Sequence, residues 1–273
     1  MSAGKEQFAQ LMRGPDDQLD LGRAALLIAE EEYPDIDVDR YLRRLDELGQ
    51  QARDRLNPDM SSREAVEVLG QLLARDRGFR GNQDDYYDSR NSFLNDVLDR
   101  QTGIPITLSA VYIEVGRRAG LDVQGVGFPA HFLAKHHDII FDPFNAGRIL
   151  SEGDCRALLA EMTGGSMDFQ PRFLEPAPTK QILARMLNNL KQIYLNARYY
   201  RKAIGIMDRL LMVNPIGYGE LRDRGAVYAE LKQYAQAKAD LEAYLKQPRQ
   251  PEDAPAVRQA LRNIDNVITL MDD

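Results

Sequence analysis

The chain has 273 residues, of which 44% are apolar, so it is long enough for one or two domains with a hydrophobic core. A formal net charge of -7 and a pI near 5.2 argue against a nucleic-acid-binding surface and against electrostatic docking on anionic membranes. The sequence has no long apolar run, no apolar signal core at its start and only one cysteine. We therefore expect a cytoplasmic protein without internal disulfides.

The N-terminal third of the chain is predicted to be helical. Leu21–Glu30 is rich in Ala and Leu, which favours a helix. Asp37 is the expected N-cap of a second helix. Ser61 and Glu64 have the spacing of a capping box at the start of a third helix. Residues 78–89, with glycines, acidic residues and paired tyrosines, are typical of a loop.

A helix, a strand and a hairpin are predicted in residues 103–142. Pro105 suits the first position of a helix, where its missing N–H costs nothing. Gly120 suits the position that follows the last helical residue, Ala119. The apolar residues at 123–128 then predict a strand that leads into the hairpin.

The hairpin is expected to bring a histidine and an aspartate together. If its two-residue turn is His136-His137, His131 lies directly across from Asp142, with the two Cβ atoms about 5 Å apart. Asp142 would then orient the imidazole of His131. Such a pair makes up two of the three members of a Cys-His-Asp or Ser-His-Asp triad.

The C-terminal third of the chain contains a helical repeat with a period of 34 residues, the period of tetratricopeptide repeats. Ser151 or Asp154 is expected to cap one more helix before it, and residues 163–178 are predicted to be a linker. The small alanines of the repeat let its two helices approach closely, and the tyrosines fill the gap between them. We expect two repeats and a polar capping helix, Ala254–Met271, with neighbouring segments burying the rest. The aligned pairs are Leu187 and Leu221, Tyr194 and Tyr228, Tyr200 and Tyr234, Ala203 and Ala237, and Met207 and Leu241.

Three blocks of sequence, Asn91–Ser109, Gly125–Phe132 and Asp142–Asn145, resemble the bacterial SirB-one family. That family couples a transglutaminase-like core to C-terminal tetratricopeptide repeats. The resemblance covers nearly the whole chain, and its first block is the most specific. It implies an α+β, mostly helical protein. A transglutaminase-like (papain-like) domain with a helical N-terminal part and a small antiparallel sheet would span residues 1–175, and an all-α repeat region would span residues 179–273.

The resemblance also implies where a nucleophile would stand. In the wider transglutaminase-like superfamily a nucleophilic Cys begins a helix that ends in Gly, and the His and Asp follow on adjacent strands. The helix N-terminus and the imidazole stabilise a thiolate that attacks an amide carbonyl. Counting back from Gly120 puts the nucleophile at Pro105, while His131 and Asp142 match the other two positions. Because proline has no nucleophilic atom, the resemblance implies the fold and disputes the activity.

Two hydroxyls are alternative nucleophiles. Ser109 is one turn beyond Pro105 on the same helix face, and Thr107 is nearer the helix start. A hydroxyl lacks the low pKa of a thiol and needs a well-placed base. Packing or surface roles therefore compete with a hydrolase or acyltransferase in which Ser109 or Thr107 acts with His131 and Asp142.

The remaining candidate residues indicate no metal or cofactor. Cys155 lies beyond Asp142, outside the expected order, and is predicted to be a structural thiol. His136 and His137 fit a solvated turn without ligand spacing for zinc. His131 itself is either a hydrogen-bonded structural histidine or part of a ligand-binding cleft. The residues expected to line the same cleft are Gln101 and Asn95.

We expect a non-catalytic protein that binds a protein or peptide partner on the concave face of its repeats. The first helices of the repeats, about residues 180–197 and 218–231, would line that face. The hydrolase or acyltransferase is the alternative. The name of the SirB-one family also hints at gene regulation, and the acidic charge favours regulation through proteins rather than DNA. We expect no membrane or nucleic-acid partner.

Overall fold

The computed structural model describes residues 3–249 and 251–272, and the chain forms two compact units that divide between Asn189 and Leu190. The first unit is mostly helical with small sheets, and the second is all helical, so the predicted α+β fold class is confirmed. The division falls inside helix α8 (Thr179–Asn196). We propose that the transglutaminase-like domain spans residues 1–175 and that the repeat region spans residues 179–273.

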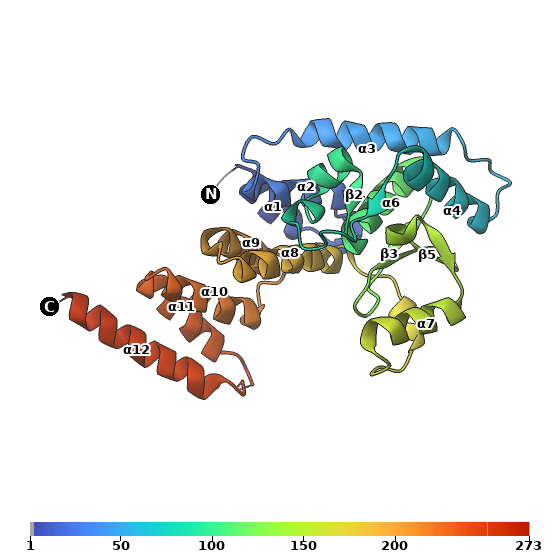
Figure 1. Ribbon diagram of the computed structural model, residues 1–273. Coiled ribbons are helices and arrows are strands. Elements are labelled where there is room, and N and C mark those ends of the chain that lie inside the picture. Colours follow the sequence, from blue (N-terminus) through green and yellow to red (C-terminus); the bar gives the residue numbers. More distant parts are fainter. Residues whose placement is uncertain (1–2, 250, 273) are drawn as a thin grey trace. The chain divides into compact units, whose positions relative to one another are not determined.

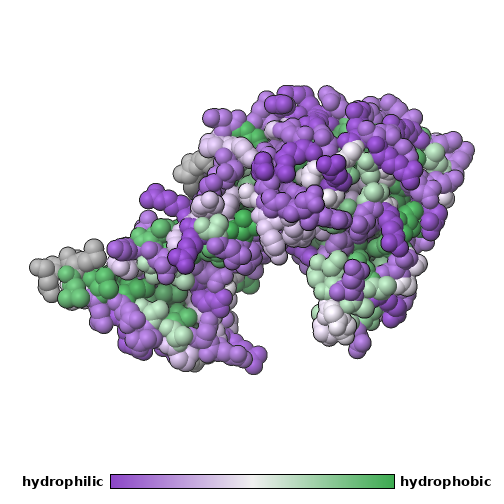
Figure 2. Space-filling model, viewed as in Figure 1, coloured by the Kyte–Doolittle hydropathy of each residue, from purple (hydrophilic) through white to green (hydrophobic). Residues whose placement is uncertain are grey.

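Capping signals in the sequence place the helices that begin the first unit (Figure 1). The Asp37 side chain accepts a hydrogen bond from the N–H of Arg40 and caps α3, as predicted. Ser61 and Glu64 form the predicted capping box of α4. The outward face along α3 is hydrophilic (Figure 2), and its leucines are buried. The elements are α1 (Ala3–Met12), η1 (Asp16–Gln18), α2 (Leu21–Ile28), η2 (Ala29–Glu31), α3 (Val38–Arg53), α4 (Ser62–Gly70) and the π-helical η3 (Gln71–Asp76).

Helix α6 (Pro105–Ala119) is the centre of the first unit. Nearly all of its residues are buried, because it contacts α3 as well as strands β3 (Val123–Val126) and β4 (Leu133–His136). Helix α5 (Leu94–Arg100) and the short η4 (Ser89–Asn91) precede it. The residues of α6 are therefore fixed by packing on several sides, which gives a rigid base for a site at its start.

The sheet of the first unit is antiparallel, as predicted, with the strand order β3-β4-β5-β6. Strands β5 (Ile139–Asp142) and β6 (Arg148–Leu150) follow β4, and a separate parallel pair joins β1 (Arg80–Gly81) to β2 (Thr102–Gly103). The sequence did not predict β6 or the parallel pair. All are two or three residues long, too short to show a period.

The predicted register of the hairpin is wrong, because each residue of β4 pairs two positions further along β5 than predicted. His136 pairs with Ile139, so the two-residue turn is His137-Asp138 rather than His136-His137. His137 has a φ of 52°, the left-handed conformation that such a turn needs. His136 is therefore not in a solvated turn. It is buried at the end of β4, and its Nδ1 donates to the carbonyl oxygen of Asp122 at 2.8 Å.

Below the sheet, Ser151 caps α7 (Glu152–Thr163), and its hydroxyl accepts from the N–H of Asp154. Helix α7 carries Cys155, which is fully buried in an apolar cluster. Hydrophobic side chains gather over this part of the molecule (Figure 2). The other members of the cluster are Val126, Phe128, Leu133, Ile140, Leu150 and Leu159, and Phe173 and Leu174 of the short helix η6 (Pro171–Leu174) pack against it. The short helix η5 (Pro143–Asn145) follows β5 and contacts α6 and β1 instead.

The second unit has the paired helices of a repeat. It contains the end of α8 followed by α9 (Tyr200–Val213), α10 (Tyr218–Glu230), α11 (Tyr234–Leu245) and α12 (Ala254–Asp272). The aligned alanines, Ala203 in α9 and Ala237 in α11, are both fully buried. Gly225 lets α10 and α11 approach closely, because a Cβ there would overlap the side chain of Leu241. None of the helices in the described ranges is long and apolar enough to cross a membrane.

Candidate functional site

Helix α6 begins at Pro105, as the sequence predicts. Ile104 before it is extended, and Pro105 is buried in the first helical position. Gly120, with a φ of 92°, ends the helix. The position that the resemblance assigns to a nucleophile is therefore the first residue of a buried helix, and it carries a proline ring.

A tight turn holds His131 in front of β4. The N–H of His131 donates to the carbonyl oxygen of Phe128 at 3.1 Å, and Ala130 has a left-handed φ of 56°. Arg185 of α8 donates from Nη1 to the oxygen of Phe128 (3.2 Å) and from Nη2 to the oxygen of His131 (2.6 Å). Its guanidinium carbon also lies 5.4 Å from the centroid of the Phe132 ring. Arg185 thus holds the backbone on both sides of the turn.

Asp142, at the end of β5, orients His131. Its Oδ2 lies 2.9 Å from Nε2 of His131, and the two side chains are only 2% and 4% exposed. The N–H groups of Phe144 and Asn145 donate to Oδ1, and Nδ2 of Asn145 donates to Oδ2 at 2.8 Å. The predicted contact between His131 and Asp142 is present. Among the described residues Nδ1 of His131 has no hydrogen-bond partner, so this ring nitrogen is left for a further group.

Phe144 packs against the other side of the histidine. Its ring meets that of His131 edge to face, with centroids 6.0 Å apart and an interplanar angle of 88°. Gly81 of β1 lies against the Phe144 ring, where a Cβ would overlap the aromatic carbons. A glycine is therefore required at position 81 by close approach. This contact joins the His131 site to the loop that follows β1.

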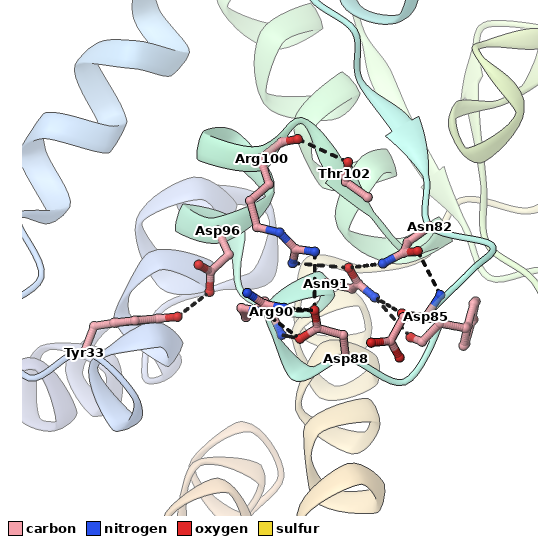
Figure 3. A network of polar contacts seen from close by, with 10 residues as sticks. Tyr33, Asn82, Asp85, Asp88, Arg90, Asn91, Asp96, Arg100 and Thr102 are labelled. Carbon is pink, nitrogen blue, oxygen red and sulfur yellow. Dashed lines mark hydrogen bonds and ion pairs between the residues drawn. The ribbon is translucent and has the colours of Figure 1, made fainter.

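Asn91 is hydrogen-bonded to that loop (Figure 3) and also to the start of α6. Its Nδ2 donates to the carbonyl oxygens of Asp85 (2.7 Å) and Tyr86 (3.2 Å), and its Oδ1 accepts from Nδ2 of Asn82 at 3.1 Å. Its own carbonyl oxygen accepts from the Thr107 hydroxyl at 2.7 Å. Asn91 is fully buried, so this network fixes the loop rather than binding solvent.

The two candidate hydroxyls have different surroundings. The Thr107 hydroxyl bonds to backbone groups around the start of α6. Ser109 is buried, and its Oγ has no hydrogen-bond partner within the described residues. The same holds for the hydroxyl of Tyr112, whose pKa is raised by burial and by the negative charge of Asp142. In the part of the chain that the structure describes, neither candidate hydroxyl is hydrogen-bonded to His131.

The structure places the two proposed cleft residues in separate pockets. Gln101, left-handed at a φ of 51°, lines a pocket of about 270 Å³ together with Arg44 and Phe79. Asn95 lines another pocket, of about 530 Å³. Neither pocket is lined by His131 or Asp142, so the pockets do not bring the four residues into one cleft.

The thiol of Cys155 faces the apolar cluster below the sheet. Burial, followed by the negative charges of Asp154 and Glu152, raises its pKa to about 11. A thiol with this pKa is almost fully protonated at neutral pH, so it is a poor nucleophile. Among the described residues, no group of three or more His, Cys, Asp or Glu side chains is arranged to hold a metal ion.

Comparison with known proteins agrees with the fold. The sequence pattern of the transglutaminase-like superfamily matches residues 39–188, and that of the tetratricopeptide repeat matches residues 190–262. The chain is 35% identical over 258 residues to the UPF0162 protein of Xylella fastidiosa, covering 92% of each chain. It is 32% identical to a UPF0162 protein of Pseudomonas aeruginosa, covering 82% of this chain and 83% of the relative.

A more distant relative matches only part of the chain. F-box only protein 21 of Mus musculus is 30% identical over 139 residues, which is 46% of this chain and 21% of the mouse protein. No solved structure matches the chain. From the matches that extend over most of its length, the chain belongs to the UPF0162 family and joins a transglutaminase-like core to tetratricopeptide repeats.

Proposed function

We propose that this protein is a non-catalytic transglutaminase-like protein that acts by binding a protein or peptide through its repeats. The observation that carries the proposal is Pro105, the first residue of α6, at the position that the family resemblance assigns to the nucleophile. A proline side chain can neither attack a carbonyl nor hold a proton for transfer. The contact between His131 and Asp142 at 2.9 Å is then the remainder of a site without its reacting atom.

The second unit supports a partner-binding role. Tetratricopeptide repeats generally present a concave surface formed by their first helices. In α10, a first helix, Gly225 and Val227 are buried while Arg222 and Ala226 are exposed. One face of α10 therefore packs within the repeat, and the other remains open to a partner.

The test replaces Ala226, exposed on α10, with arginine. Because Ala226→Arg adds a long charged side chain to the proposed binding face, we expect it to abolish specific capture of partners from cells in a quantitative crosslinking and mass-spectrometry experiment. The matched control is Ala239→Arg, the same substitution at an exposed alanine of α11, and it should retain the partners. Equal capture by both variants and the wild type would contradict the proposal.

These variants are made in the full chain for a structural reason. Removing the chain from residue 179 onward would delete the repeats and also Arg185, which donates to the carbonyl oxygens of Phe128 and His131. Loss of binding in such a shortened chain could then reflect damage to the first unit. Single substitutions on the exposed faces of α10 and α11 avoid this ambiguity.

A hydrolase or acyltransferase is the second candidate, and one observation favours it. The buried Oγ of Ser109 has no hydrogen-bond partner among the described residues, and buried hydroxyls usually have one. If Ser109 acts with His131 and Asp142, an activity-based fluorophosphonate should label the wild type but not Ser109→Ala. Thr107→Ala provides the same test for the other hydroxyl. An unlabelled wild type would remove this support.

We also propose that the protein works in the bacterial cytoplasm, as its single cysteine suggests, and in regulation through protein contacts, at which the name of the SirB-one family hints. The net charge of -7 supports protein contacts over DNA contacts. In a bacterial strain that lacks the gene, wild-type protein should restore the altered transcripts and Ala226→Arg should not. Full restoration by Ala226→Arg would contradict this regulatory proposal.

A further inference from the structure

The first unit contains a pocket that neither His131 nor Asp142 lines. The end of α3, the start of α4 and the loop that joins these helices (Figure 1) form one part of its wall. The end of α6 and the two adjacent histidines His136 and His137 form the other part. The volume is about 370 Å³, and pockets for small molecules commonly have volumes of about 300–1,000 Å³.

His136 presents an unpaired ring nitrogen to this pocket. Its side chain is only 5% exposed, and Nδ1 donates to the carbonyl oxygen of Asp122 at 2.8 Å, which fixes the orientation of the ring. The other ring nitrogen, Nε2, has no hydrogen-bond partner among the described residues, and it is not sealed off by its neighbours as the unpaired Oγ of Ser109 is. Since almost all of the ring is buried and the residue lines the pocket, Nε2 is the atom that the imidazole offers to a ligand there.

The start of α4 contributes hydrogen-bond donors to the same space. Its N-cap, Ser61, and its first residue, Ser62, both line the pocket. The capping box satisfies the N–H groups of Ser61 and Glu64, whereas those of Ser62 and Arg63 have no acceptor in the described part of the chain. Unpaired N–H groups in the first turn of a helix carry partial positive charge and favour an anion.

The charge of the lining favours an anion as well. Arg53, the last residue of α3, lines the pocket and donates to the carbonyl oxygen of Arg118, and it forms no ion pair with a carboxylate of the described residues. No Asp or Glu is among the lining residues, although the chain has 42 acidic residues. The carboxylate of Glu64 is used in the capping box. The pocket is therefore a site of positive potential in an acidic protein.

Apolar side chains complete the wall, so the pocket can also cover the uncharged part of a ligand. The ring of His137 lies beside that of His136, with the centroids 4.3 Å apart. The apolar lining residues are Leu56, Met60, Ala65, Ala119 and Leu121.

We propose that this pocket binds a phosphate monoester with a small apolar body, through Nε2 of His136, the guanidinium of Arg53 and the unpaired N–H groups at the start of α4. In its imidazolium form His136 donates from both nitrogens, so Nε2 can donate to a phosphate oxygen while Nδ1 keeps its contact with Asp122. A metal cation fits less well, because Arg53 and the helix N-terminus would repel it. The ester could be a free metabolite or a phosphorylated side chain of a protein. This site goes beyond the repeat-mediated binding proposed above and uses none of its residues.

The experiment measures binding to the full-length protein by isothermal titration calorimetry. The probes are phenyl phosphate, a blocked Gly-phosphotyrosine-Gly peptide, benzoate, and phenol as the neutral analogue. We expect phenyl phosphate to bind more tightly than benzoate, its binding to weaken as the salt concentration rises, and phenol not to bind. Tighter binding of the peptide than of phenyl phosphate would assign the phosphate to a protein, and the reverse order would assign it to a free ester.

Two side-chain variants remove the proposed contacts. His136→Asn keeps an N–H donor for the carbonyl oxygen of Asp122 but has no counterpart of Nε2, and it should weaken phenyl phosphate at least about tenfold. Arg53→Met removes an exposed charge and should weaken it similarly, while Arg53→Lys should restore part of the affinity. The control is Arg43→Met, at an exposed position of the same helix, which changes the net charge equally and should not affect affinity.

A matched pair of variants tests the helix N-terminus. Proline is tolerated at the first helical position, so Ser62→Pro removes one unpaired N–H group and should weaken phenyl phosphate at least about threefold. Ser62→Ala keeps that N–H group and should bind as the wild type does. Equal affinity in these two variants would overturn the role of the helix N–H groups. Unaltered affinity in both His136→Asn and Arg53→Met, tighter binding of benzoate than of phenyl phosphate, or no binding of phenyl phosphate at millimolar concentration would overturn the proposal.

Discussion

Nε2 of His131 lies 2.9 Å from Oδ2 of Asp142, although His131 is not on the strand that pairs with the strand of Asp142. The histidine stands in the turn before β4 and reaches the carboxylate from there. The observed register differs from the predicted one by two residues along β5. Since side chains alternate between the two faces of a sheet, a displacement of two residues leaves every side chain of the hairpin on its predicted face. The turn before β4 therefore positions His131 for this contact, and Arg185 donates to the carbonyl oxygens of Phe128 and His131 at its two ends.

Arg185→Met should destabilise the first unit by about 1.5–3 kcal/mol, the range for hydrogen bonds that involve a charged group. The substitution removes both donors to the carbonyl oxygens of Phe128 and His131. The measurement is the urea midpoint followed by circular dichroism. The control, Arg156→Met, removes an exposed arginine that pairs with Glu152 on α7 and should cost less than about 0.5 kcal/mol. Equal losses in the two variants would show that Arg185 has no special role in the turn.

Cys155→Ser should retain partner binding and lower the free energy of unfolding by about 1–2 kcal/mol, because it puts a hydroxyl into an apolar cluster. In the wild type, the thiol should react with a disulfide reagent far more slowly in the native state than in urea, since it is buried and its pKa is raised to about 11. Loss of all function in a folded Cys155→Ser variant would contradict the non-catalytic proposal.

Asp96→Asn should raise the free energy of unfolding at neutral pH by less than about 1 kcal/mol. Burial raises the pKa of Asp96 in the folded state, so the native protein binds this proton more tightly than the unfolded chain does. The stabilisation that comes from this tighter proton binding is complete below the pKa of an aspartate in the unfolded chain, near 3.9. It is lost as the pH rises through the pKa of Asp96 in the folded protein.

The measurement is the difference in unfolding free energy between Asp96→Asn and the wild type from about pH 4 to pH 7, with Asp168→Asn, at an exposed position, as the control. The unfolding free energy of Asp96→Asn should increase relative to that of the wild type as the pH rises, because the asparagine side chain carries no charge to desolvate. A gain that shrinks with rising pH would show that the folded protein favours the ionised form of Asp96.

Local signals predicted the helix starts well. The caps at Asp37 and Ser61, and the start of α6 at Pro105, all lie where the sequence puts them, because a capping side chain acts within a few residues. The hairpin was harder to predict. Both candidate turns join apolar strands of similar length, and the left-handed conformation of His137 and the hydrogen bond of His136 to Asp122 decide between them.

Contacts between distant segments could not be predicted from patterns. The loop fixed by Asn91 and the packing of Gly81 on Phe144 join residues with no shared periodicity. The only signal was that Asn91 begins the sequence block most specific to the family. The positions of Asn95 and Gln101 could not be predicted for a similar reason. They are six positions apart yet line different pockets, and Gln101 ends α5 in a left-handed conformation.

The most direct test of the central claim concerns Pro105. If Pro105 occupies the nucleophile position, Pro105→Cys places a thiol at the start of α6, where the helix N-terminus and His131 would stabilise a thiolate. The thiol should then have a pKa below the ordinary value of about 8.5. Catalysis need not return, because binding of an acyl substrate requires more than the reacting atom.

The measurement is the rate of alkylation by iodoacetamide against pH for Pro105→Cys in a Cys155→Ser background, with His131→Ala added as the control. We predict fast alkylation near pH 7 and a thiol pKa that rises when His131 is replaced. An ordinary thiol pKa that His131→Ala leaves unaltered would contradict the account, because Pro105 would then not occupy the nucleophile position.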